Sequence, residues 1–119
     1  DQVFIALAGA DLYSMLTKGG QDSAKVRSNL RSAGYDGERM KTLLWAIDPI
    51  RVAHRLQPEC TWLYTAMFDQ VVPAECGAAL GRAAGLEGDH HVWLPGGHYS
   101  SVMFIPRMVH DLLAKMRVE

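Results

Sequence analysis

The sequence has little cysteine, no long apolar run and no excess of charge of one sign. Its 119 residues include two cysteines, and 12 basic side chains face 13 acidic ones, for a net charge of -1. Two cysteines do not make a disulfide framework, so we expect Cys60 and Cys76 to be reduced, small core residues. Balanced charge gives no electrostatic reason to bind nucleic acid or an anionic membrane surface. No apolar run approaches the roughly 20 residues that cross a bilayer, so we expect no membrane segment.

The composition is that of one globular domain. Hydrophobic residues make up 49% of the chain and charged residues 21%, which argues against disorder. This length fits a single domain with one core. The chain begins at Asp1 and not at Met, and no basic segment precedes an apolar stretch. We therefore expect further residues upstream, no secretory signal, and, with both cysteines reduced, a cytoplasmic location.

Three apolar runs predict strands, at residues 3–8, 61–68 and 91–94. The first two are apolar throughout and do not alternate with polar residues, which is typical of parallel strands covered on both faces. Each run is followed directly by a residue that is typical of loops, namely Gly9, Asp69 and Pro95.

Helical segments separate these strands. A spacing of three and four residues predicts a last helix with one apolar stripe, formed by Val102, Ile105, Val109, Leu112 and Met116. Another helix is predicted from about residue 73 to 84, and several shorter ones between residues 11 and 56. This order predicts an α/β fold in which a small parallel three-stranded sheet carries helices on both faces.

Ligands bind at the carboxyl ends of the strands in open parallel sheets. Asp69 directly follows the most apolar strand, and His98 follows the next strand on a loop that contains Gly96 and Gly97. Neighbouring parallel strands place these loops side by side, so we expect Asp69 to accept a hydrogen bond from a ring N–H of His98. Such a contact fixes the tautomer of a general base and stabilises its imidazolium form. We expect the two glycines to permit the turn that aims the ring.

Several segments carry a resemblance to a known family. Residues 68–73 (FDQVVP) and 94–99 (LPGGHY) resemble the acid loop and the histidine loop of α/β-hydrolases, the esterase-like and peptidase-like serine hydrolases. Residues 48–56 resemble the segment that leads into the acid-bearing strand, and residues 3–12 the strand and turn after the nucleophile helix. The resemblance runs over about residues 2–117 and corresponds to the C-terminal half of that fold.

The resemblance implies a Ser-His-Asp triad in which Asp69 is the acid and His98 the base, acting on an ester or related acyl bond of a small substrate. The nucleophile of that family lies in a G-x-S-x-G motif, which this chain does not contain, so it would have to lie outside the chain. Residues 13–47 then correspond to a helical cap-like insert within a single partial domain, 1–119. No cofactor and no metal are implied. The expected partner is the missing N-terminal half, or a second copy that pairs through the strand edge at residues 3–8.

Other interpretations remain open. Because the chain has no nucleophile motif, the alternative is a non-catalytic interaction module or an inactive truncated hydrolase. A third interpretation is a ligand-binding domain that uses the cleft of the former active site. Asp89, His90, His91 and His98 suggest a metal site, but adjacent histidines in a strand point to opposite faces.

Two further possibilities concern Cys76 and the segment around Trp45. Cys76, near a predicted helix start, is an alternative nucleophile, but its place on the outside of the sheet disfavours that role. Met40, Leu43, Leu44 and Trp45 are candidates for an acyl pocket or for simple helix core.

Overall fold

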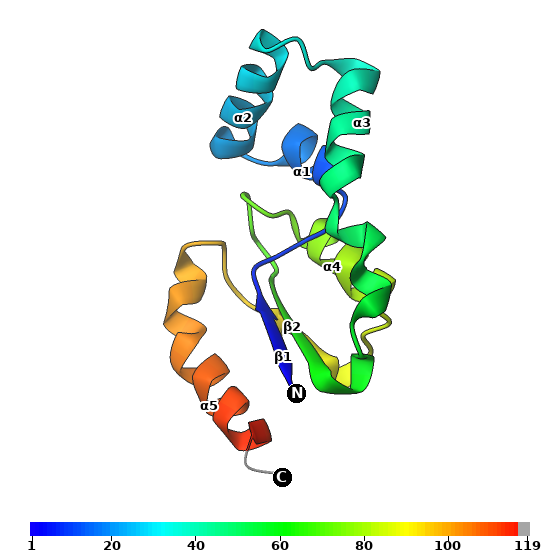
Figure 1. Cartoon of the computed structure of the whole chain (residues 1–119). Helices are drawn as coiled ribbons and strands as arrows, with labels where there is room; N and C mark the ends of the chain where they lie inside the picture. The colour runs from blue at the N-terminus through cyan, green and yellow to red at the C-terminus, as the bar shows by residue number, and fades with distance from the viewer. Residues whose placement is uncertain (117–119) are drawn as a thin grey trace.

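Three parallel strands form the centre of the computed structural model, which describes residues 1–116. They are β1 (Val3–Ala6), β2 (Thr61–Ala66) and β3 (His91–Leu94), in the order β1-β2-β3, with Val3 opposite Thr61 and Leu63 opposite His91. The predicted α/β class and parallel sheet are confirmed (Figure 1). The end of the family resemblance, residue 117, lies outside the described residues.

Two strands are shorter than predicted, whereas β3 has its predicted bounds. β1 ends at Ala6 and not at residue 8, because Leu7 takes a left-handed backbone conformation with φ 54°. β2 ends at Ala66 and not at residue 68. Met67 and Phe68 still donate backbone hydrogen bonds to the carbonyls of Leu94 and Gly96, but they form an exposed turn.

Five α-helices surround the sheet. They are α1 (Leu12–Lys18), α2 (Gln21–Ser32), α3 (Gly37–Ile47), α4 (Ala74–Ala83) and α5 (Ile105–Met116). The helix predicted at residues 73–84 is confirmed as α4. It begins after Pro73, whose fixed φ suits a helix start, and it ends before Gly85, which takes the left-handed conformation at φ 68°.

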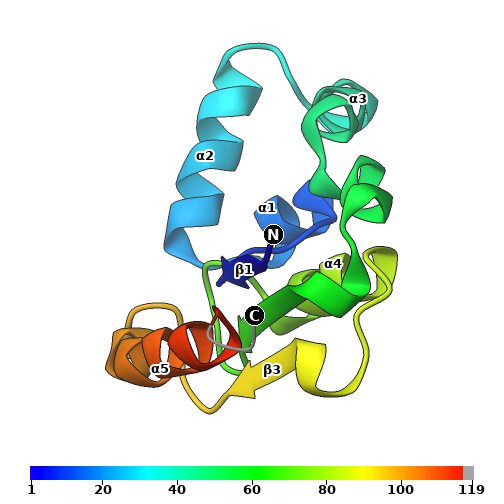
Figure 2. The ribbon, with the colours of Figure 1, turned by 60° about the horizontal axis from the view of Figure 1, so that its bottom comes forward.

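The two faces of the sheet carry different helices, as Figure 2 shows. Side chains alternate along β2, so Leu63 packs with Leu80 and other residues of α4, whereas Trp62 and Tyr64 face the other side. On that second side Phe104, the residue before α5, and Met108 of α5 pack against them. Every residue of β2 is buried, as its unbroken apolar run predicts.

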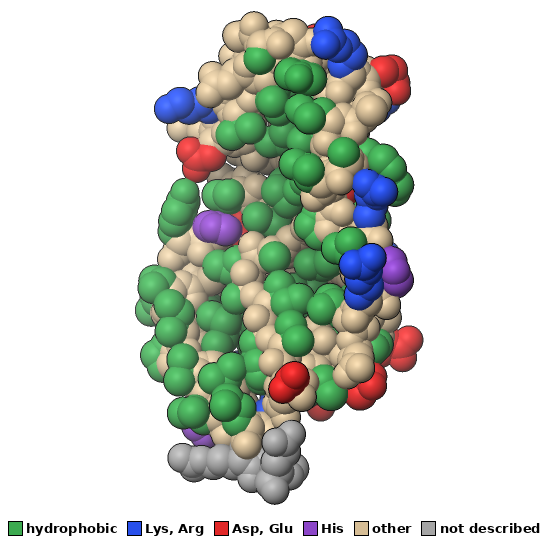
Figure 3. All heavy atoms as spheres, in the orientation of Figure 1, with side chains coloured by type: hydrophobic (Ala, Val, Ile, Leu, Met, Phe, Trp, Pro, Cys, Tyr) green, Lys and Arg blue, Asp and Glu red, His purple; other side chains and the backbone are tan. Residues whose placement is uncertain are grey.

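Helix α5 does not bury the stripe that its sequence defines. Four of its five members are exposed, Leu112 is half-buried, and no residue of α5 is fully buried. The hydrophobic residues that pack on the sheet, Phe104 and Met108, were not part of that stripe. Figure 3 shows hydrophobic side chains gathered on the surface of α5 and toward β1. An apolar face of this helix is therefore left uncovered.

Helices α1, α2 and α3 form a unit above the carboxyl ends of the strands (Figure 1). This unit covers the residues expected to be a cap-like insert, 13–47, and is helical as predicted. It is tied to the rest of the chain by the backbone hydrogen bond from Gly20 N–H to the Gln70 carbonyl, 2.6 Å, and by the ion pair of Lys18 with Glu75, 2.7 Å. The start of α2 thus lies against the loop that follows β2.

The buried carboxylate of Asp48 holds together the two ends of this helical unit, where the chain enters α1 and leaves α3. It accepts hydrogen bonds from the N–H groups of Asp11, Leu12 and Ile50 at 2.8 to 3.1 Å. These bonds satisfy a charge that would otherwise be costly to bury. Among the helices described, we find none with the length and apolar character needed to cross a membrane.

Candidate functional site

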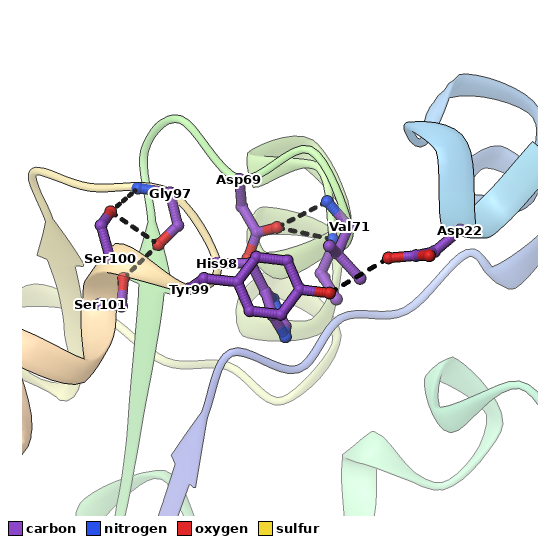
Figure 4. Close-up of polar contacts among 9 residues, drawn as sticks. Asp22, Asp69, Val71, Gly97, His98, Tyr99, Ser100 and Ser101 are labelled. Atoms are coloured by element: carbon purple, nitrogen blue, oxygen red, sulfur yellow. Dashed lines mark hydrogen bonds and ion pairs between the residues drawn. The ribbon is translucent and has the colours of Figure 1, made fainter.

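Asp69 and His98 meet at the carboxyl edge of the sheet. The loops after β2 and β3 bring Nδ1 of His98 to 2.8 Å from Oδ2 of Asp69 (Figure 4). The contact expected from the order of the strands is therefore confirmed, while the catalytic roles of the two residues stay predictions. Because a carboxylate can only accept, Nδ1 carries a proton. In the neutral ring Nε2 then holds the free lone pair, and it has no hydrogen-bond partner within residues 1–116.

The second carboxylate oxygen of Asp69 holds the residue in place. Oδ1 accepts hydrogen bonds from the backbone N–H groups of Val71 and Val72, both at 2.8 Å. This is the turn that an aspartate forms with its own following backbone. The side chain is only 1% exposed, and its three hydrogen bonds compensate for the burial of the charge. The carboxylate thus has a single orientation toward the imidazole.

The histidine loop is closed by its own serines. Ser100 Oγ accepts from the Gly97 N–H at 2.8 Å, and Ser101 Oγ donates to the Gly97 carbonyl at 2.7 Å. Neither Gly96 nor Gly97 takes a left-handed conformation, so a positive φ is not what these glycines contribute to the turn. Space is the reason at Gly97, where a Cβ atom would lie 3.2 Å from the Phe68 carbonyl oxygen.

A cavity of about 370 Å³ opens beside His98. It lies between the loops after β2 and β3 and the start of α2, and is lined by Gly20, Gln21, Asp22, Phe68, Gln70, Val71, Gly97, His98, Tyr99 and Ser100. The His98 side chain is 27% exposed, so a small molecule in this cavity can reach the ring. The geometry provides an oriented imidazole at the wall of a ligand-sized space.

Tyr99 closes one side of this cavity by reaching the helical unit. Its hydroxyl donates to Asp22 Oδ2 at 3.1 Å, and Figure 4 shows its ring beside His98. This hydrogen bond to the carboxylate raises the pKa of the Tyr99 hydroxyl, with a smaller contribution from the charge of Asp69. No local sequence pattern indicates a role for Asp22 at this site, because it lies 77 positions from Tyr99 and shares no motif with it.

The residues considered for a metal site do not come together. His98 follows β3, whereas Asp89, His90 and His91 precede or begin it. His90 Nδ1 lies 2.9 Å from the Thr61 carbonyl oxygen, and His91 Nε2 lies 2.9 Å from Thr65 Oγ1. In the part of the chain that the structure describes, no group of three His, Cys, Asp or Glu side chains is placed to hold an ion. Burial lowers the pKa of His91, which disfavours the charged form of that ring.

Cys76 is placed as a core residue. Its thiol is buried within α4, and burial raises its pKa to about 11, so the reactive thiolate is scarce at neutral pH. Both cysteines are free thiols as expected, but Cys60 is only half-buried, in the turn before β2. The expectation that both belong to the core therefore holds for Cys76 alone.

The candidates for an acyl pocket do not line the cavity beside His98. Met40 and Leu44 are buried in the helical unit, which is the simple core interpretation. Trp45 is exposed, and the guanidinium of Arg51 lies 5.7 Å from its ring centre. The apolar wall of the cavity comes instead from Phe68, Val71 and Tyr99.

Comparison with protein-family models, curated proteins and solved structures finds no match for this chain. The site contains an oriented carboxylate–imidazole pair, a cavity against the ring, and a tyrosine that joins the cavity to the helical unit.

Proposed function

We propose that this chain supplies the acid and base of a serine hydrolase that acts on an ester or related acyl bond. The observation that carries the proposal is the 2.8 Å contact between His98 Nδ1 and Asp69 Oδ2 at the wall of a cavity. A buried carboxylate that orients an imidazole is the arrangement a general base needs. The nucleophile is a serine outside this chain, because residues 1–119 contain no G-x-S-x-G motif.

In the proposed reaction, Nε2 of His98 takes the proton of the serine hydroxyl as its oxygen attacks the acyl carbon. The imidazolium that forms is stabilised by Asp69. It gives the proton to the departing alkoxide, and the acyl group remains on the serine. In the second half, Nε2 takes a proton from water, the resulting hydroxide attacks the acyl-serine, and the proton returns to the serine oxygen.

The missing half is proposed to pair with β1. In a parallel ladder, alternate residues point their N–H and C=O groups to opposite sides. Leu7 N–H donates to the Tyr64 carbonyl, so the backbone groups of Phe4 and Ala6 point away from β2. No described strand pairs with that edge, and the uncovered apolar surface of α5 lies next to it (Figure 3). A partner segment that contains one strand and an adjoining helix would cover both the edge of β1 and the apolar face of α5.

A non-catalytic interaction module is the second candidate function. The same uncovered edge and helix face support it, together with the lack of a nucleophile motif in the chain. In this alternative the partner uses the surface of β1 and α5, and the pair formed by Asp69 and His98 serves only to hold two loops together.

Labelling with a fluorophosphonate, which reacts with activated serines, distinguishes the two. The test uses the polypeptide as its gene encodes it, intact and carrying His98→Ala or Asp69→Asn. We expect a labelled serine outside residues 1–119 and a fall in ester turnover of roughly 10³-fold or more in both variants. Asp36→Asn, an exposed carboxylate on the helical unit, is the control for loss of one charge.

Either of two results contradicts the proposal. One is near-normal turnover in the His98 variant, which would take the base away from this residue. The other is a complete lack of labelling in a polypeptide that is folded by circular dichroism, which favours the interaction module.

A further inference from the structure

We propose that the cavity beside His98 binds an organic ammonium group, for which Asp22 is the counter-ion. The binding itself needs no catalysis, but its meaning as substrate selectivity rests on the proposed function. A preference for an ammonium group would restrict the substrates to esters or related acyl compounds that carry a positive charge near the reacting bond.

The charges at the cavity favour a cation. Among the described residues that line it, none is Lys or Arg, and Asp22 is the only carboxylate. Asp22 Oδ2 accepts from Tyr99, whereas Oδ1 has no hydrogen bond within residues 1–116. Asp69, which bonds His98 behind the wall, adds a second negative charge. The start of α2 contributes only about half a positive charge, which is less than the full negative charge of the Asp22 carboxylate.

Aromatic rings complete the proposed site. Phe68 and Tyr99 both line the cavity and both are exposed, at 69% and 73%. The faces of aromatic rings attract cations, and an ammonium group is held well where such faces meet a carboxylate. Gln21 and Gln70, two further polar side chains of the wall, offer amide oxygens as acceptors.

The position of Asp22 makes this site relevant to the reaction. Tyr99 follows His98 directly, and its ring lies edge-on to the imidazole with 5.3 Å between ring centres. Tyr99 also holds Asp22 by the 3.1 Å hydrogen bond. A cation at Asp22 is therefore separated from the imidazole by about one ring, which places an adjoining acyl bond within reach of His98.

The test measures binding of three probes of one shape and different charge. Benzylamine is cationic at pH 7, benzyl alcohol is neutral and benzoate is anionic. Each is titrated into the chain, and the dissociation constant is taken from the amide NMR shifts of Asp22, Gly97 and Tyr99. We expect benzylamine to bind about fivefold or more tightly than benzyl alcohol, as expected for one carboxylate with aromatic faces, and benzoate to bind weakest.

Two variants assign the preference to Asp22. In Asp22→Asn, which keeps an acceptor for Tyr99, the ratio of the dissociation constants for benzyl alcohol and benzylamine should fall to about one. Tyr99→Phe keeps the carboxylate and should keep the preference for the cation. Glu59→Gln, an exposed site in the turn before β2, is the control for loss of one negative charge.

Three results overturn the proposal. They are equal binding of benzylamine and benzyl alcohol, a lack of binding of benzylamine at millimolar concentrations, and equal effects of Asp22→Asn and Glu59→Gln. None of these results bears on the acid–base pair, because serine labelling tests that pair independently of the charge of the substrate.

Discussion

Asp69 uses its two carboxylate oxygens for different purposes, Oδ2 for the imidazole of His98 and Oδ1 for the N–H groups of Val71 and Val72. The residue thereby fixes its own loop and the neighbouring ring with one side chain. A substitution that keeps the hydrogen bonds to the loop and changes the one to His98 can therefore separate the structural role of Asp69 from its effect on the imidazole.

Asp69→Asn is that substitution. The asparagine Oδ1 can still accept from Val71 and Val72, so the loop should keep its shape. Its amide nitrogen then faces His98 Nδ1 and donates, which forces the ring proton to Nε2. We expect ¹⁵N NMR of His98 at a pH where the ring is neutral to show Nδ1–H in the intact chain and Nε2–H in the variant.

Asp22→Asn is the matched control, since it makes the same chemical change at the cavity wall without touching the imidazole contact. It should leave the tautomer of His98 unchanged. An intact chain that already shows Nε2–H would contradict the Asp69–His98 hydrogen bond.

His91 makes stability depend on pH. Burial, and to a smaller extent the charge of Arg82, lower its pKa from the ordinary value of 6.5 in the folded protein. The unfolded chain then binds a proton at a higher pH than the folded chain. The free energy of unfolding should be fully retained above about pH 6.5 and fall as the pH drops below it.

Urea unfolding at pH 7.5 and 5.5 measures this effect. Because other groups also titrate, the informative quantity is the difference between the intact chain and His91→Gln. We expect the variant to lose less stability between these two pH values. An identical loss in both would assign the pH dependence to other residues.

Gly77 permits α4 to pack closely on β2. A Cβ atom at this position would lie 2.6 Å from both Cγ2 and Oγ1 of Thr65, a β-branched residue with little freedom to move. Although alanine is the better helix former, we expect Gly77→Ala to lower the free energy of unfolding by about 1–3 kcal/mol through overpacking. Urea denaturation measures the change.

Thr65→Ala provides the control for the Gly77 experiment, because it removes Cγ2 and Oγ1, the two atoms that a Cβ at residue 77 would contact. Gly77→Ala should cost clearly less stability in the Thr65→Ala background than in the intact chain. Equal costs in the two backgrounds would mean that the contact between α4 and β2 is not the cause.

The free edge of β1 should make the isolated chain associate. Because the backbone groups of Phe4 and Ala6 have no described partner strand, we expect light scattering at micromolar concentration to give a mass above 13.2 kDa. Ala6→Lys places a charge at this edge and should shift the mass toward the monomer. Asn29→Lys, exposed on α2, should not. A monomeric intact chain would show that the edge does not drive self-association.

The sequence alone was sufficient to predict the pair at the site. Asp69 and His98 each follow an apolar run, and parallel strands bring their carboxyl ends to one edge of a sheet. The succession of strands and helices along the chain and the helical nature of residues 13–47 also followed from local patterns. These predictions succeeded because hydrophobic periodicity and turn residues act over a few positions.

Only the tertiary structure determined what surrounds this pair. The contact of Asp22 with Tyr99 joins residues 77 positions apart, and the early end of β1 comes from the left-handed conformation of Leu7. The apolar stripe of α5 was visible in the sequence, but the side that meets the sheet was not. Spacing along a helix shows that residues share a face, whereas burial depends on which other segments pack against it, and that choice is made by the whole fold.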